Sequence, residues 1–355
     1  MKRFLLYILC LLLLESSCQP SEQPEQQNEE HEANALRFRW ELMDTLTHAS
    51  LRGLSTVSTA TAWASGQYGT ILRTTDGGNH WEQRSVPGID SADFRDVEAI
   101  SENVAYVLAA GSPAYIFKTT DGGATWAKQY ENIAPDIFLD GMAFWDEQHG
   151  IVMGDPMDGY FTILRTEDGG QTWERVPSEN LPSPQKGEAG FAASGTNIIA
   201  RDNRYAWFAT GGGASRVLRS SDRGVTWEAS PTPMTQGAAS QGIFSFTFTD
   251  SLRGVAVGGD YQSPEVATQN ACYTTDGGHT WQLAENPPRG YRSGVAYLSS
   301  AKTYIAVGPG GSDYSADGIR WHPLDSVGYH SIQSRPGGKA AWVSGSDGRI
   351  ARVTW

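Results

Sequence analysis

The phrase TTDGGNHW at residues 74–81 decides the fold, because it returns along the chain at a nearly constant spacing. Further copies are TTDGGATW at 119–126, TEDGGQTW at 166–173, SSDRGVTW at 220–227 and TTDGGHTW at 274–281. A phrase that repeats at a period of about 45 residues indicates an array of like units. The chain is therefore expected to build one small architecture several times over.

Each residue of the phrase has a structural task in a tight turn. Asp76 can accept hydrogen bonds from the amides of its own turn, and Thr74 offers a hydroxyl to the same network. Gly78 permits a positive φ, and Trp81 supplies a large apolar surface to pack between units. One carboxylate per turn is too few ligands for calcium. We therefore predict a structural role, without metal, for the aspartates of the five copies: Asp76, Asp121, Asp168, Asp222 and Asp276.

Alignment on this phrase reveals four short strands per unit, which is the blade of a β-propeller. The fourth strand opens at a tryptophan in six units: Trp81, Trp126, Trp173, Trp227, Trp281 and Trp321. The seventh unit, 329–355, stops after its third strand, while FRWELMDT at 38–45 resembles a fourth strand. The sequence therefore predicts an all-β fold over residues 37–355. We expect a single seven-bladed propeller whose N-terminal strand completes the last blade.

The N-terminal region is expected to lie outside this fold. Residues 1–17 read as a signal peptide, with two basic residues followed by an apolar run from Phe4 to Leu14. Cys18 follows two serines, as in a bacterial lipoprotein signal, although Glu15 replaces the aliphatic residue of that pattern. Residues 18–36 are predicted to be a lipidated cysteine and a disordered acidic tether, since they contain too few apolar residues for a core. The chain is thus expected to be an exported bacterial lipoprotein of the outer membrane, on its periplasmic or cell-surface side. A secreted protein with a chance cysteine is the alternative.

Composition narrows the possible partners. The formal net charge is −13 and no run of Lys or Arg occurs, so we expect no nucleic-acid binding. No cofactor is expected, because the chain lacks a Gly-x-Gly-x-x-Gly turn between a strand and a helix. The histidines have no metal-ligand spacing, so no metal is expected either. Cys272 would be the only cysteine of the mature domain, and we expect it to be a small buried residue. The domain is expected to be a monomer.

A binding site is expected at one mouth of the central channel. The long segments 154–161, 177–190, 231–242 and 258–271 should all emerge on the face opposite the repeated turns. The innermost strands begin at that face, and their first residues supply the candidate ligand-binding side chains Arg52, Arg95, Arg292, His330, Asp96 and Asp140. Arginine suits a carboxylate or phosphate through paired hydrogen bonds. Two other interpretations remain open: arginine and aspartate pair with each other to satisfy the rim, or Asp96 and Asp140 act as the acid and base of a glycoside hydrolase.

The repeated phrase resembles the Asp-box, or BNR, pattern, in which His80 replaces the usual threonine of the first copy. Sialidases, xyloglucan-cleaving hydrolases, sortilin-type receptors and Ycf48, a photosystem II assembly factor, carry this pattern. The sequences of the blades over residues 38–355, together with the lipoprotein-like N-terminal segment, are most similar to the Ycf48-like group. That resemblance implies an envelope-anchored, non-catalytic propeller that binds a protein partner or an anionic or sugar-like ligand. The alternative it leaves is a glycoside hydrolase related to sialidases or xyloglucanases. A plain sialidase is disfavoured, because seven blades are expected and the Arg-Ile-Pro stretch of that family is absent.

Overall fold

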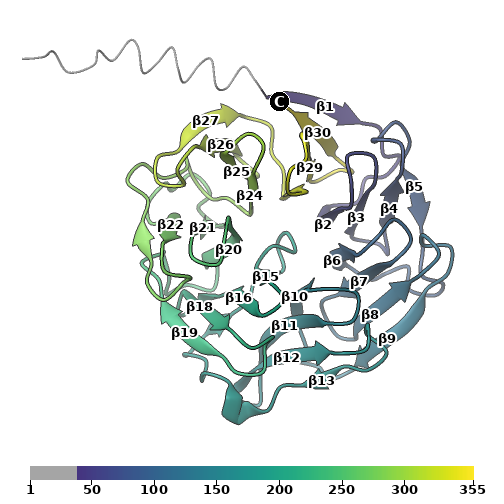
Figure 1. Ribbon diagram of the computed structural model, residues 1–355, viewed down its shortest axis with the longest axis horizontal. Helices are drawn as coiled ribbons and strands as arrows, with labels where there is room; N and C mark the ends of the chain where they lie inside the picture. Colours follow the sequence, from purple (N-terminus) through teal and green to yellow (C-terminus); the bar gives the residue numbers. More distant parts are fainter. Residues whose placement is uncertain (1–37) are drawn as a thin grey trace, which may run out of the picture. The chain divides into compact units, whose positions relative to one another are not determined.

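The computed structural model describes residues 38–355, which form seven antiparallel four-stranded blades around a central channel (Figure 1). The predicted seven-bladed all-β fold is thereby confirmed. The predicted signal peptide, the lipidation site Cys18 and the acidic tether lie outside the described residues and stay predictions. No helix within residues 38–355 combines the length and the apolar character that crossing a membrane requires.

The strands follow one another from the channel outward in each blade. The first three blades are β2 (Leu51–Thr56), β3 (Ala62–Gly66), β4 (Ile71–Thr74), β5 (Glu82–Arg84); β6 (Phe94–Ala99), β7 (Ala105–Ala109), β8 (Ala114–Thr119), β9 (Ala127–Asn132); and β10 (Leu139–Phe144), β11 (Gly150–Met157), β12 (Tyr160–Thr166), β13 (Glu174–Arg175). The fourth and fifth are β15 (Ile198–Arg201), β16 (Tyr205–Ala209), β18 (Arg216–Ser220), β19 (Glu228–Pro231); and β20 (Gln241–Phe248), β21 (Gly254–Asp260), β22 (Ala271–Thr274), β23 (Gln282–Leu283). The last two are β24 (Gly294–Leu298), β25 (Thr303–Gly308), β26 (Gly311–Ser315), β27 (His322–Asp325); and β28 (Ser331–Ser334), β29 (Ala340–Ser344), β30 (Ile350–Thr354), β1 (Arg39–Met43). Three short elements lie outside this pattern. One is the 3-10 turn η1 (Ser178–Asn180). The other two are the strands β14 (Glu188–Ala189) and β17 (Gly211–Gly212), which extend the sheet of the fifth blade because β17 pairs with β20.

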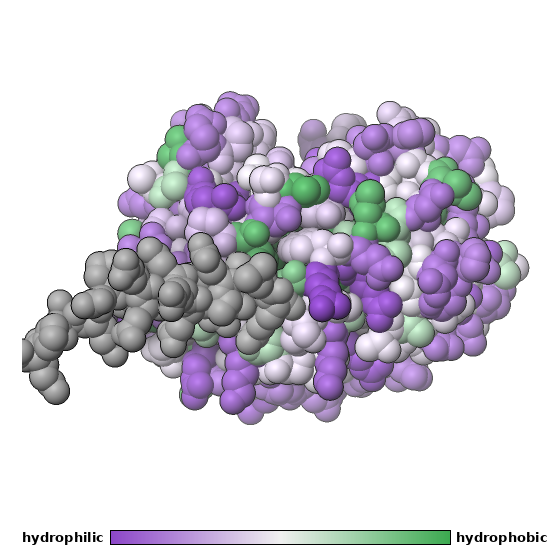
Figure 2. Space-filling model, turned by 90° about the horizontal axis from the view of Figure 1, so that it is seen from above, coloured by the Kyte–Doolittle hydropathy of each residue, from purple (hydrophilic) through white to green (hydrophobic). Residues whose placement is uncertain are grey.

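The N-terminal strand closes the ring, as predicted. β1 pairs antiparallel with β30, and Trp40 lies opposite Val353. The indole of Trp40 stacks on Tyr329 with ring centroids 5.4 Å apart, while the ring of Phe38 is buried beside Trp355. This pairing covers the outer edge of β30, to which another chain could otherwise add a strand. In an edge-on view the surface is mainly hydrophilic with isolated hydrophobic side chains, as is usual for a soluble surface (Figure 2).

The Asp-box turns form the hydrogen-bond network that the sequence predicts. In the second copy, Asp121 accepts bonds from the amide of Thr125 at 2.9 Å and from its hydroxyl at 2.6 Å. The hydroxyl of Thr119 donates to the same carboxylate at 2.8 Å and accepts from the amide of Gly123, whose φ is 84°. In the first copy the ring of His80 takes the place of the threonine hydroxyl and lies 2.7 Å from the Asp76 carboxylate.

The tryptophan of each box packs against the neighbouring blade. Trp81 meets Trp342 of the seventh blade edge-on, with ring centroids 5.4 Å apart, and Trp126 meets Trp63 of the first blade in the same way at 6.2 Å. These hydrophobic contacts between blades are the core of the fold, since a blade alone has an apolar face on each side. The face that carries the box turns is called the box face below, and the opposite face the loop face.

The fourth blade departs from the prediction at its inner edge. Alignment placed an innermost strand at 190–198, whereas β15 begins only at Ile198. Residues 190–197, called the channel segment, run instead through the centre of the ring (Figure 1). Its glycines make this passage possible: an added Cβ at Gly190 would lie 2.3 Å from a carboxylate oxygen of Asp140, and one at Gly195 would lie 2.2 Å from Asp96. The channel is therefore divided into two pockets, one at each face.

Candidate functional site: the pocket on the loop face

The pocket on the loop face, called the loop-face pocket, has a volume of about 470 Å³. It lies where the innermost strands begin, which is where the sequence predicted a site. The wall is formed by side chains of six blades and the channel segment: Arg52, Arg95, Phe138, Asp155, Ala189, Gly190, Phe191, Ala192, Ala193, Ala239, Phe244, Tyr261, Tyr291, Pro309 and His330. Three of the six predicted ligand-binding residues are among them: Arg52, Arg95 and His330.

β-Bulges aim several of these side chains at the pocket. The pairing of β2 with β3 skips Arg52, and the pairing of β6 with β7 skips Arg95. The same irregularity occurs at Asp140 in β10 and at Phe244 in β20. A bulge bends its strand and turns the extra residue away from the regular pleat. The repeated bulge therefore sets one side chain apart from the regular pleat at the start of the innermost strand in four of the seven blades.

Arg52 is the least satisfied cation of the pocket. Its Nε atom is buried and has no hydrogen-bond partner among residues 38–355. Burial, and then the neighbouring guanidinium of Arg95, lower the pKa of Arg52 from its ordinary value. A guanidinium stays protonated in proteins even so. The pocket thus holds a fixed positive charge that lacks a protein anion of its own, and a carboxylate or phosphate would supply it.

Arg95 is held more firmly. Its Nε lies 2.5 Å from a carboxylate oxygen of Asp93, and its Nη1 donates to the carbonyl of Ala192 at 3.1 Å. The second bond ties this arginine to the channel segment. Because Asp93 pairs with Arg95, Arg52 is the guanidinium of this pair without an ion-pair partner among residues 38–355.

His330 contributes a neutral ring. Burial first, then the guanidiniums of Arg52 and Arg95, lower its pKa to about 4. Its Nε2 lies 3.2 Å from the hydroxyl of Ser50 and 2.9 Å from that of Ser346. The ring is therefore uncharged at neutral pH and serves as a polar wall rather than as a second cation.

Aromatic rings form the other side of the pocket. Phe191 of the channel segment stacks on Phe244 with centroids 3.9 Å apart. Tyr291 and Tyr261 meet Phe244 edge-on, at 4.8 Å and 6.0 Å. Burial raises the pKa of the Tyr291 hydroxyl, which consequently stays protonated. Such a wall offers apolar contact beside the arginines, a combination that suits a ligand with both a hydrocarbon part and a negative charge.

Asp155 is the carboxylate in the wall of the pocket. It accepts a hydrogen bond from the amide of Gly190 at 2.8 Å, and burial raises its pKa to about 6. The residue lies at the end of β11, in the segment GDPMDGYF. The sequence identified this segment as one of the long loops of the binding face but did not single out the aspartate.

The other three predicted residues do not line the pocket. Arg292 is 2% exposed and forms a buried ion pair with Asp313, to which its Nε donates at 2.7 Å. Asp96 is 1% exposed and accepts from the amides of Val97 and Met142, both at 2.8 Å. Arg292 therefore pairs with an aspartate, as one of the alternative interpretations expected, although the sequence analysis did not name Asp313 as the partner. Asp96 instead binds backbone amides beside the channel segment.

Asp140 is fully buried, and neither of its oxygens has a hydrogen-bond partner among residues 38–355. Burial, reinforced by the charge of Asp155, raises the pKa of Asp140 well above its usual range, against the opposing effect of Arg95. The carboxyl lies against Gly190 and is closed off by it. Alignment of the blades puts Leu139 level with Arg52 and Arg95, whereas Asp140 occupies the corresponding bulge position in β10.

The residues of the pocket wall that sequence reasoning missed include Asp155, Phe191, Tyr261 and Tyr291. Asp155 lies near the end of β11 and Tyr261 directly follows β21, and the ends of these second strands reach the same face as the starts of the first strands. Counting both ends would have found them. The five Asp-box aspartates line neither channel pocket, and within residues 38–355 no group of three or more His, Cys, Asp or Glu is placed to hold a metal ion.

Fold and pocket together define a single seven-bladed propeller of the Asp-box kind with a charged and aromatic channel mouth. A family model described as photosynthesis system II assembly factor YCF48 matches residues 32–132. The photosystem II assembly protein Ycf48 of Synechococcus sp. (strain JA-2-3B'a(2-13)) is 28% identical over 144 residues, which cover 40% of this chain and 41% of that protein. Xyloglucanase Xgh74A of Acetivibrio thermocellus is 30% identical over 194 residues, covering 48% of this chain and 22% of the enzyme. The chain thus spans less than half the length of these curated relatives.

Solved structures share the fold at low identity. YCF48 bound to D1 peptide superposes with a TM-score of 0.64 at 18% identity, covering 89% of this chain and 97% of that one. YCF48 from Cyanidioschyzon merolae gives 0.62 at 18% identity, covering 88% and 98%. The GH74 enzyme of Niastella koreensis gives 0.59 at 16% identity, covering 85% and 52%.

Proposed function

We propose that this propeller is a non-catalytic binding module that holds a segment of a partner protein in the loop-face pocket through a carboxylate of that segment. The observation that carries the proposal is the buried, unpartnered Nε of Arg52 beside Arg95, facing a wall of aromatic rings. A peptide offers both a carboxylate and apolar side chains, so it can use both sides of the pocket. The similarity to Ycf48 proteins, one of which is solved with a D1 peptide, supports a protein as the partner.

The surface around the pocket also suits a protein. Several exposed large hydrophobic side chains stand on loops of the loop face, among them Leu46, Tyr68, Ile133 and Tyr261. Tyr68 is 72% exposed and Leu46 is 89% exposed, both at positive φ in short turns. Apolar residues around a charged pocket are the pattern of a protein interface. In this proposal a lipid on Cys18 tethers the module to a bacterial envelope, where it acts as an assembly or accessory factor.

Glycoside hydrolysis is the weaker proposal. It draws on the xyloglucanase relatives and on the acid–base role suggested for Asp96 and Asp140. Hydrolysis of this kind needs two carboxyl groups that flank a bound sugar. Asp96 and Asp140 are buried behind the channel segment, and the wall of the loop-face pocket contains only one carboxylate, that of Asp155. The pocket therefore supports binding better than this chemistry.

Binding of short peptides to the intact chain tests the proposal. The probes are fluorescent hexapeptides that end in leucine or phenylalanine, each with a free C-terminal carboxylate and in an amidated form. We expect the free carboxylate to bind more tightly, and Arg52→Ala to weaken binding by about tenfold or more, as for loss of a charge-assisted hydrogen bond. Arg253→Ala is the matched control, because this arginine lies on the box face with a side chain 72% exposed.

The pH dependence gives an independent readout. Asp155 has a pKa of about 6, so acidification through that value removes a negative charge from the wall and should strengthen carboxylate binding. Asp155→Asn should bind tightly at pH 7.5 and lose this dependence. Equal binding of amidated and free peptides, or unchanged binding by Arg52→Ala, would contradict the proposal. Release of sugar from xyloglucan oligosaccharides by the intact chain would favour the hydrolase instead.

A further inference from the structure

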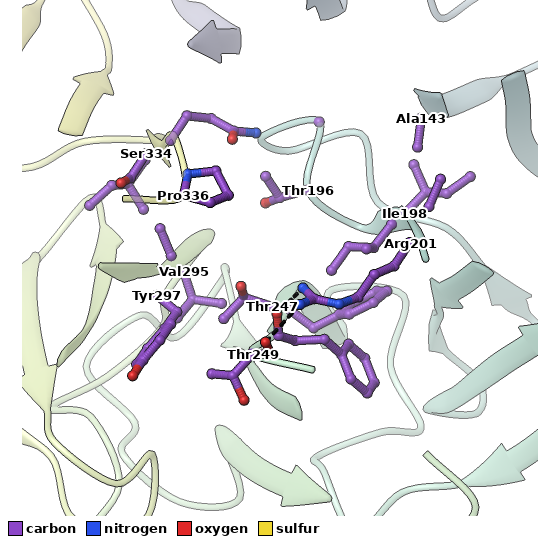
Figure 3. A pocket seen from close by; sticks show the side chains of 18 of the residues that line it. Ala143, Thr196, Ile198, Arg201, Thr247, Thr249, Val295, Tyr297, Ser334 and Pro336 are labelled. Carbon is purple, nitrogen blue, oxygen red and sulfur yellow. Dashed lines mark hydrogen bonds between the residues drawn. The ribbon is translucent and has the colours of Figure 1, made fainter. Parts of the chain in front are cut away.

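A second pocket, called the box-face pocket, opens at the other end of the channel and has a volume of about 390 Å³ (Figure 3). Its wall comes from the final residues of the innermost strands, including Glu98 of β6, Phe144 of β10, Tyr297 of β24 and Gln333 of β28. The channel segment contributes Gly195 and Thr196 and separates this pocket from the loop-face pocket. Nothing in the proposed function uses this end of the channel.

Glu98 supplies the carboxyl group of the box-face pocket, and no cation among residues 38–355 pairs with it. No ion pair within residues 38–355 includes its carboxylate, and the charge that acts on it is the carboxylate of Asp96 on the same strand. Burial, together with Asp96, holds the pKa of Glu98 well above its usual range. Two neighbouring carboxyl groups without a cation attract a positive charge from outside, because it would relieve their repulsion.

The positive charge of this pocket is already engaged. Arg201 donates from Nη1 to the carbonyl of Phe248 at 2.8 Å and from Nη2 to that of Thr249 at 2.7 Å. Figure 3 shows this guanidinium turned toward Thr247 and Thr249 at the wall. Its Nε also lies 3.5 Å from the carboxylate of Asp202. Arg201 is thus bound to the protein, and an anionic ligand would find no free cation here.

Aromatic and neutral polar groups complete the wall. Phe144 is half-buried and stacks on Tyr106 at 4.3 Å between centroids, and Tyr297 is half-buried beside Tyr304 at 4.7 Å. Ring faces attract cations through their quadrupole. The side chains of Thr247 and Gln333 also line the pocket and offer oxygen acceptors for N–H donors. Carboxylate, ring faces and neutral acceptors together form the environment that recognises an organic ammonium group.

We propose that the box-face pocket is a second ligand site, which binds a small organic amine with its ammonium group paired to Glu98. The site is independent of the peptide site on the loop face, since the channel segment lies between them. The titratable and charged side chains that face Glu98 or share its pocket are Asp96, Arg201 and Tyr297. The pKa of Asp96 is raised to about 7 and that of Glu98 is also raised, in both cases chiefly by burial. Amine binding should therefore strengthen as pH rises and be accompanied by release of a proton.

Isothermal titration of the intact chain with cadaverine tests this site, and 1,5-pentanediol is the matched neutral probe of the same length. At pH 8 we expect cadaverine to bind and the diol not to bind, and at pH 5 we expect cadaverine to bind more weakly. Glu98→Gln should weaken cadaverine by about tenfold or more, since the charge-assisted bond is lost. Glu228→Gln is the control variant, because that glutamate lies on the outer strand β19 with its side chain 77% exposed.

Glu98→Asp provides a further check in case the amide variant does not fold, since it retains the charge and should retain measurable cadaverine binding. The proposal is overturned if cadaverine does not bind at millimolar concentration, if the diol binds equally well, or if Glu98→Gln binds as tightly as the unaltered chain. Each of these outcomes leaves the peptide proposal untouched, because its probes and its Arg52 variant report on the other pocket.

Discussion

The Asp-box turns and the channel differ in how completely their polar groups are satisfied. In the boxes every aspartate accepts bonds from its own turn, and the pKa values of Asp76 and Asp121 fall to about 2 as a result. In the channel, by contrast, buried polar atoms of Arg52, Asp140 and Asn197 have no partner among residues 38–355. A buried polar group without a partner costs stability, so it persists where something other than stability retains it. The aspartates of the repeated turns are thus satisfied, although the indole N–H groups of Trp81, Trp126 and Trp173 in the same boxes have no partner among residues 38–355. In the channel the unpartnered atoms include Nε of Arg52, which faces a pocket and can meet a ligand.

The closing strand should have the largest effect on the structural side of this comparison. Deleting residues 36–46 removes the pairing of β1 with β30 and the buried ring of Phe38. We expect a loss of about 5 kcal/mol or more in the free energy of unfolding, since a large buried aromatic alone contributes about 3–5 kcal/mol. Thermal unfolding followed by circular dichroism measures it.

Deletion of residues 19–34, outside the described part of the chain, is the control for this truncation and should leave the melting temperature nearly unchanged. Equal melting temperatures for the two truncations would show that β1 is dispensable and that the ring is held by the other blades alone.

Asp140 tests the channel side. Its folded pKa lies above the ordinary value of 3.8, so the folded state keeps a proton that the unfolded chain has released. The free energy of unfolding should therefore fall as pH rises above about 4. Asp140→Asn should be more stable than the unaltered chain at pH 8 by about 1–3 kcal/mol, the usual cost of a buried polar group without a partner.

Urea unfolding of both chains at pH 5 and pH 8 measures this difference. Asp155 and Glu98 also have raised pKa values, so some pH dependence should remain in the variant. A variant that is less stable at both pH values would mean that the Asp140 carboxylate is compensated and that the channel is as complete as the boxes.

A single Asp box should have the smallest effect. Asp222→Ala removes the acceptor for the amide and hydroxyl of Thr226 and for the hydroxyl of Ser220. This turn is mostly exposed, so water replaces part of what is lost. We expect the melting temperature to fall by about 2–4 °C, the change that roughly 1 kcal/mol produces in a domain of this size. Peptide binding should be unchanged; a variant that melts normally but no longer binds would place the site on the box face.

The fold could be predicted from the sequence because it is repeated. Each copy of the phrase repeats the same evidence, and the unpaired third strand of the last unit indicates where FRWELMDT belongs. Residues of the pocket wall were predicted only where they follow the repeat: Arg52, Arg95 and His330 share a position at the start of an inner strand. Their role as a binding site stays a prediction. Register errors of one residue matter there, as at Asp140, because a bulge has no sequence signature of its own.

The channel segment could not be predicted in the same way. Blade alignment forces residues 190–197 into the pattern of the other blades, and nothing local to the segment reveals that it crosses the channel. Its course depends on distant contacts: the hydroxyl of Ser331 donates to the carbonyl of Ser194, and that of Thr196 lies 2.6 Å from the hydroxyl of Ser245. The pairing of Arg292 with Asp313 is of the same kind, since it joins a residue just before β24 to a residue of β26.

The pairing of β1 with β30 also orders events in time. A ribosome completes residues 39–43 early, but their partners at 350–354 are synthesised only after the strands of six other blades. The first strand must therefore wait, unpaired, while six blades form behind it. Bringing together strands so far apart in sequence is slow, because loop closure costs entropy before any contact forms. A chain whose translation stops before β30 can pack the earlier blades together but cannot pair β1 with β30. The ring is therefore closed only in chains that contain the seventh blade.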